Sequence, residues 1–162
     1  MPLSKYFWKK GYTGLYLSDS PAAENHQYSY ASRLKVLAAV NAKQLDVVWM
    51  NREAYDIFSQ SGYLLDLSEF LSQNSPELYP DLAPYLIEND VILEDNAIAY
   101  TLNEADSYTS VTEKAVNAME ITDFHMVSDA GFPDSVYLGV IANSQRRSSD
   151  LDYIKYLYSF GR

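Results

Sequence analysis

The predicted fold is decided by the stretch Asn41–Leu67, which reads NAKQLDVVWMNREAYDIFSQSGYLLDL. Within it, the apolar residues of Leu45–Met50 are consecutive rather than alternating, a pattern typical of a strand covered on both faces in a parallel sheet. Asn51 is expected to cap a helix at Arg52–Gln60, and Gly62 to end that helix in the left-handed conformation. A short extended piece follows, and then a second helix that is expected to begin at Asp66 or Ser68, so the order of elements predicts a βαβ unit.

Further elements are expected on both sides of this unit. Tyr12–Ser18 is predicted to form a first strand, and apolar spacing predicts a helix at Tyr30–Lys43. Toward the end of the chain, Ser135–Asn143 is an apolar strand and Leu151–Phe160 a helix. Two short strands around Glu94–Asn96 favour a hairpin. The predicted fold class is α/β, a three-layer sandwich with a central mixed, mainly parallel sheet.

Length and composition set the broad class of the protein. The 162 residues suit a single domain, residues 1–162. The aromatic and basic residues 1–10 are interpreted as an appended or juxtamembrane segment. The net charge is −10, and the stretch Glu53–Glu113 contains no Lys or Arg, which argues against binding to nucleic acid. No apolar run is long enough for a membrane span.

Few residues are available for metal or redox chemistry. The chain has no Cys and only His26 and His125, so neither a cysteine-based site nor a metal centre is expected. Four carboxylates near the predicted hairpin are open to two interpretations, a Ca²⁺ site or a solvated hairpin tip; they are Glu88, Asp90, Glu94 and Asp95. The second is favoured. No cofactor is expected, and the absence of nucleophile and phosphate-binding motifs predicts a protein that is not an enzyme.

The order of three segments resembles a known family. These segments are LAAVNAKQLDVVWM, SQSGYLLDLSEFL and the later VYLGVIANSQRRSSDLDYIKYL. In that order they are similar to one lobe of the type II periplasmic-binding proteins, the extracellular solute-binding proteins of ABC transporters. Because two full lobes need about twice this length, the chain resembles a reduced, mostly single-lobed relative. Residues 105–130 would then be a vestigial second lobe or a long connection, and Ile121–Val127 within them is expected to form a strand.

The resemblance implies a location and a set of partners. The protein would be extracytoplasmic and held at the membrane through a segment absent from this chain. Its function would be small-molecule binding or an accessory role in transport, without catalysis. The alternative is a structural or protein-interaction module that self-associates and has lost its ligand. A small-molecule ligand, a homodimer and a membrane-protein partner all stay open.

The expected ligand site lies at the carboxyl ends of the strands, where open α/β sheets bind their ligands. The candidate ligand-binding residues are Ser18, Asp19, Trp49, Asn51 and Tyr100. Trp49 is expected to stack on a ligand, and Asn51 and Ser18 to form hydrogen bonds with it. The alternative is structural: Trp49 belongs to the core and Asn51 is only a helix cap.

Overall fold

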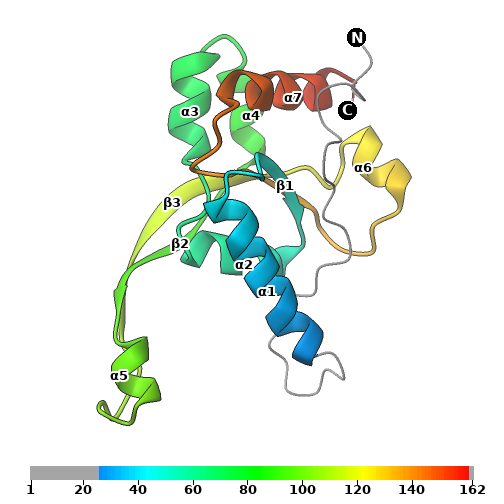
Figure 1. Ribbon diagram of the computed structural model, residues 1–162. Coiled ribbons are helices and arrows are strands. Elements are labelled where there is room, and N and C mark those ends of the chain that lie inside the picture. The colour runs from blue at the N-terminus through cyan, green and yellow to red at the C-terminus, as the bar shows by residue number, and fades with distance from the viewer. Residues whose placement is uncertain (1–25, 161–162) are drawn as a thin grey trace. The chain divides into compact units, whose positions relative to one another are not determined.

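The computed structural model describes residues 26–160, and the chain divides into two compact units, Met1–Ala38 and Ala39–Arg162 (Figure 1). The described part of the first unit is the beginning of helix α1 (His26–Asn41), whose last turn belongs to the second unit. The helix predicted at Tyr30–Lys43 is thereby confirmed, with both ends shifted toward the N-terminus.

The second unit is built on one sheet of four strands. These are β1 (Val47–Met50), β2 (Leu86–Asp95), β3 (Ser110–Glu120) and β4 (Tyr137–Val140). Their order across the sheet is β1-β4-β3-β2, and every neighbouring pair is antiparallel. The predicted class, a three-layer sandwich with a mainly parallel sheet, is therefore wrong, and the protein is a small α/β protein with an antiparallel sheet. The strand predicted at Tyr12–Ser18 lies outside the described residues.

The packing of β1 explains this error. Val47 and Trp49 point to one face of the strand and pack against the main hydrophobic core. On the other face, Met50 and Leu64 pack where Gly139 has no side chain, and a Cβ atom on Gly139 would lie 2.7 Å from Leu64 Cδ2. Both faces of β1 are covered, as the continuous apolar run predicted. However, a continuous apolar run indicates only that a strand is buried on both faces, and it does not indicate the direction of the neighbouring strand.

The helices that follow β1 form as the sequence predicts, but the predicted βαβ unit is wrong, because the extended piece between the two helices makes only an isolated antiparallel bridge, from Leu64 to Ile141. Asn51 caps α2 (Arg52–Gln60), and its Oδ1 accepts a hydrogen bond of 2.9 Å from the amide of Ala54. Gly62 follows with φ of 72°, in the left-handed region that favours glycine. Asp66 caps α3 (Leu67–Asn74) in the same way, through the amide of Glu69 at 2.8 Å. These predictions are confirmed because capping depends on a few adjacent residues.

The middle of the chain departs from the prediction. Two short helical turns, α4 (Tyr79–Leu82) and η2 (Ala83–Tyr85), lead into β2. The sequence predicted a hairpin of two short strands around Glu94–Asn96. Instead, β2 continues as one strand to Asp95, and the short helix α5 (Ala97–Thr101) follows it. The partner of β2 is β3, whose first five residues are exposed and, except for Val111, polar.

The remaining elements complete the second unit. Helix α6 (His125–Ala130) follows β3, so the strand predicted at Ile121–Val127 is wrong. Helix α7 (Arg147–Phe160) follows β4 and confirms the predicted C-terminal helix, which begins earlier than expected. Residues 105–130 supply β3 and α6 to this unit.

The core of the second unit lies between the sheet and helices α3, α4, α6 and α7. Its fully buried side chains include Leu71, Leu82, Met119, Leu138 and Leu157. In Figure 1, α3, α4 and α7 gather at one end of the sheet, and the β2–β3 hairpin extends from the other end. The hairpin therefore leaves the region in which apolar side chains are buried.

Candidate functional site

The β2–β3 hairpin, called the arm below, runs from a buried base to an exposed end. At its base, Leu86 pairs with Met119, which is buried; at its end, Asp95 pairs with Ser110. The first five residues of β3 and the last three of β2 are all exposed. The arm ends in α5 (Figure 1). An isolated two-stranded ribbon is only marginally stable in water, so this end of the arm gains little from its own pairing.

The end of the arm, residues Leu93–Val111, is called the arm tip. Large apolar side chains are exposed there, with exposed fractions between 46% and 78%. They are Leu93, Ile98, Tyr100, Leu102, Tyr108 and Val111, which together are called the apolar cap. Among the residues whose burial the structure describes, eleven large apolar side chains are exposed, and these six are the majority. A concentration of exposed apolar side chains of this kind often marks a site where another molecule binds.

The arm tip is ordered by its own hydrogen bonds. The Asn96 side chain donates to the Ser107 carbonyl oxygen at 2.9 Å and accepts from the Thr109 amide at 2.8 Å. The amide of Asn96 donates to the Thr109 carbonyl oxygen at 3.2 Å. The rings of Tyr100 and Tyr108 meet with centroids 6.3 Å apart. The apolar cap is therefore held on a defined backbone, which lowers the entropy cost of binding a partner.

A buried polar network fixes the base of the arm to α2. The Tyr55 hydroxyl donates to Asn117 Oδ1 at 2.8 Å, and Asn117 Nδ2 donates to Ser59 Oγ at 2.8 Å. Ser59 Oγ in turn donates to the Asp90 carbonyl oxygen at 2.8 Å. Burial raises the pKa of the Tyr55 phenol, which therefore stays protonated as a donor. These bonds connect α2 to both strands and set the direction in which the arm leaves the sheet.

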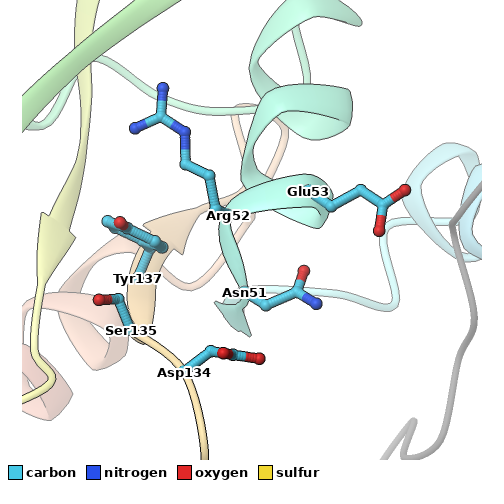
Figure 2. A pocket seen from close by; sticks show the side chains of 6 residues that line it. All are labelled: Asn51, Arg52, Glu53, Asp134, Ser135 and Tyr137. Atoms are coloured by element: carbon cyan, nitrogen blue, oxygen red, sulfur yellow. The ribbon is translucent and has the colours of Figure 1, made fainter.

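A small pocket of about 380 Å³ lies where β1 ends and β4 begins. Figure 2 shows that it is lined from two segments, the β1–α2 junction and the chain that enters β4. The lining residues are Asn51, Arg52, Glu53, Asp134, Ser135 and Tyr137. The Arg52 guanidinium pairs with Asp56 at 3.0 Å and lies over the ring of Tyr55 at 5.4 Å. The lining of the pocket therefore offers polar groups, including the carboxylates of Glu53 and Asp134, to a small polar molecule.

The structure does not bring the predicted ligand-binding residues into one site. Trp49 is half-buried, packs against the core and meets the ring of Phe132 at 6.2 Å. Asn51 lines the pocket, but its Oδ1 already accepts the capping hydrogen bond of α2. Tyr100 lies on α5 at the arm tip, whereas β1 is at the opposite edge of the sheet from β2. Ser18 and Asp19 lie outside the described residues.

The structure also shows where the four carboxylates of the predicted hairpin lie. Glu88, Asp90, Glu94 and Asp95 are spread along β2. Asp90 pairs with Lys114 at 3.0 Å. Within residues 26–160, no group of three or more His, Asp or Glu side chains is arranged to hold a metal ion.

A second polar cluster joins the start of β1 to the start of α7. Ser144 Oγ lies 2.9 Å from Asp46 Oδ1 and 2.7 Å from Asp150 Oδ2. Asp150 is 1% exposed, and burial raises the pKa of its carboxyl to about 6. The Ser144 hydroxyl is the donor to both carboxylates and has one proton to share between them. The cluster connects segments that are far apart in the sequence.

The residues of the apolar cap other than Tyr100 were not among the predicted site residues. The signal for them lies in the segment NAIAYTL, in which Ile98 and Leu102 are four positions apart and acidic residues flank a short apolar stretch. The same pattern is also typical of one strand of a hairpin, and a strand would not be expected to expose these side chains.

The described residues contain no helix whose length and apolar character would allow it to cross a membrane. Comparison with known proteins adds no functional information. No protein-family profile, curated protein sequence or solved structure matches the chain significantly. The resemblance to type II periplasmic-binding proteins therefore stays a prediction, and inferences about function rest on the arm and the pocket themselves.

Proposed function

We propose that this protein is a non-catalytic interaction module that contacts another macromolecule through the arm tip. The observation that carries this proposal is the exposure of the six side chains of the apolar cap at the end of the arm. Each of these side chains contributes roughly 1 to 2 kcal/mol of binding free energy when a partner covers it. The cap is distant from the core, so its apolar character does not serve the folding of the sheet.

The internal order of the arm tip supports this proposal. A mobile loop would lose conformational entropy on binding, at roughly 1 to 2 kcal/mol for each residue that becomes fixed. Here the side chain of Asn96 and the helical turn of α5 already hold the cap before any partner arrives. The hydrogen bond from Tyr55 to Asn117 further anchors the base of the arm to α2.

Photo-cross-linking in cells that express the protein natively tests this proposal. A photo-reactive phenylalanine derivative replaces Ile98 in the arm tip or, as a control, Met126, an exposed apolar residue of α6. We expect a discrete cross-linked protein from position 98 that is absent from position 126. Its yield should fall when Leu102 is changed to Ser. Identical products from both positions, or no product from position 98, would contradict the proposal.

A second candidate function is the binding of a small polar molecule in the pocket beside Asn51. The observation that favours it is that Glu53, Asp134 and Ser135 line one space of about 380 Å³. Thermal-shift measurements with sugars, amino acids and polyamines test it, since a ligand that binds only the folded state raises the melting temperature. A shift that disappears in Asp134→Asn but persists in Asp129→Asn, an exposed residue of α6, would support this function.

Three expectations from the family resemblance stay predictions under either proposal. They are the extracytoplasmic location, the anchor in a segment absent from this chain and the accessory role in transport. Self-association also stays a prediction, and the measurement of oligomeric state described below tests it.

A further inference from the structure

The apolar cap lies among acidic side chains, and this combination specifies the chemistry of the partner. We infer that the arm tip binds an amphipathic protein segment in which Lys or Arg side chains flank apolar ones, rather than a second copy of this chain. The inference rests on the proposed function, because it names the class of partner for the same surface.

The charge of the arm tip has one sign. From Leu93 to Glu113 the sequence contains five acidic residues and no Lys or Arg. These residues are Glu94, Asp95, Glu104, Asp106 and Glu113, and all five are exposed. The next cation along the chain, Lys114, already pairs with Asp90 at 3.0 Å. A partner that covers the apolar cap must therefore come close to several carboxylates that no cation of the arm tip neutralises.

The carboxylates are placed around the cap rather than apart from it. Asp95 Oδ2 accepts a hydrogen bond of 3.3 Å from the hydroxyl of Tyr108, a cap residue. Glu94 is the cross-strand partner of Val111, another cap residue, and Glu104 follows Leu102 by two residues. Among the described residues, Glu94, Glu104 and Asp106 form no ion pair. Cations on a partner would meet these groups at the rim of an apolar contact, where charge complementarity sets specificity and association rate.

The tyrosines of the cap suit the same partner. The rings of Tyr100 and Tyr108 are exposed and lie at an interplanar angle of 64°. Their faces attract ammonium and guanidinium groups. Ile98 and Leu102, four residues apart, lie on the same side of α5 and supply the apolar contact.

Within residues 39–160, a second copy of the chain offers little unpaired positive charge as a complementary surface. Between Ala39 and Phe160 there are six Lys and Arg residues. Four of them pair with carboxylates of the same chain: Arg52, Lys114, Arg146 and Lys155. A fifth, Arg147, donates hydrogen bonds to the carbonyl oxygens of Ala142 and Ser144. Contact between two arm tips would place like charges together, which opposes binding.

Binding of defined peptides to the full-length protein tests the inference. The probes are an amphipathic helical peptide of Leu and Lys, and the same peptide with every Lys replaced by Glu or by Gln. Fluorescence anisotropy measures each affinity at low and at high salt. We expect the Lys peptide to bind at least about tenfold more tightly than the Glu or Gln peptide, with an affinity that falls as salt screens the charges.

Matched variants separate the arm tip from the general negative charge of the protein. The double variant Glu104→Gln and Asp106→Gln should weaken the Lys peptide about three- to tenfold, and Ile98→Ser with Leu102→Ser about tenfold. The control variants Asp81→Asn with Asp129→Asn, and Met126→Ser, remove equal charge or exposed apolar surface elsewhere. We expect them to change the affinity less than about twofold. Equal losses in tip and control variants would overturn the inference.

Two further measurements identify other occupants. Sedimentation equilibrium that shows a dimer abolished by Ile98→Ser would overturn the inference in favour of a second copy. Tip-dependent binding to phosphatidylcholine vesicles would overturn it in favour of a lipid surface. A cross-linked protein at position 98 without binding of the Lys peptide would overturn the inference about charge while leaving the proposed function intact.

Discussion

At the scale of single residues, Asp150 makes stability depend on pH in an unusual direction. Burial raises the pKa of its carboxyl to about 6 from an ordinary value of 3.8, so the folded state binds this proton more tightly than the unfolded state. Its contribution to stability is therefore fully present below about pH 4 and is lost as the pH rises through about 6. From pH 4.5 to pH 7 the loss amounts to about 2 kcal/mol.

The variant Asp150→Asn should remove this dependence. The asparagine side chain keeps an oxygen that accepts from Ser144 Oγ, as Asp150 Oδ2 does, and it does not ionise. We expect the free energy of unfolding of the variant, relative to that of the natural protein, to be higher at pH 7 than at pH 4.5 by about 2 kcal/mol. Urea unfolding at the two pH values measures this difference. A difference that is the same at both would show that Asp150 does not carry the effect.

The hydroxyl of Tyr55 is expected to matter for stability because its partner is buried. In Tyr55→Phe, the side chain of Asn117, which is 1% exposed, loses the donor to its Oδ1. An unsatisfied buried polar group costs about 1 to 3 kcal/mol. Tyr63→Phe removes the hydroxyl from a half-buried ring nearby and should cost less than about 0.5 kcal/mol. Thermal or urea unfolding compares the two, and equal effects would contradict the role of the network.

At the scale of elements, the arm tip is expected to be separable from the fold. Asp95 and Ser110 are paired across the arm, so residues 96–109 are replaceable by the two-residue turn Asn-Gly. The replacement deletes the cap residues of α5 and its flanks but no side chain of the core. We expect the free energy of unfolding to change by less than about 1 kcal/mol and tip-dependent binding to disappear. Collapse of the fold would show that the tip contributes to the core after all.

The same elements show how far the sequence predicts the structure. Asn51, Gly62 and Asp66 mark helix ends correctly because each acts on backbone groups within four residues. The direction of β1 depends on its pairing with β4, which lies about ninety residues further along the chain, and no local pattern encodes it. The partner of β2 was missed for a related reason, since the exposed half of β3 is polar and has no apolar alternation.

At the scale of the whole molecule, the antiparallel sheet removes the basis for the predicted ligand site and leaves the arm tip as the candidate binding surface. The predicted ligand site assumed an open parallel sheet, in which the carboxyl ends of the strands share one edge. In the antiparallel sheet β1 and β4 run in opposite directions, so Asn51 meets Tyr137 and the residues before it instead. What remains of the site is a small polar pocket. The apolar cap contains six of the eleven exposed large apolar side chains among the described residues, and only one of the six, Tyr100, was a predicted site residue.

The central claim is that the arm tip is the surface through which this protein binds a basic partner. Hydrogen–deuterium exchange of the full-length protein, with and without the amphipathic Lys peptide, tests it most directly because it locates the contact along the chain. The account predicts slower exchange in residues 93–111 and little change in α2, α3 and α7. Slower exchange confined to the pocket around Asn51 and Tyr137, or spread evenly over the acidic surface, would contradict it.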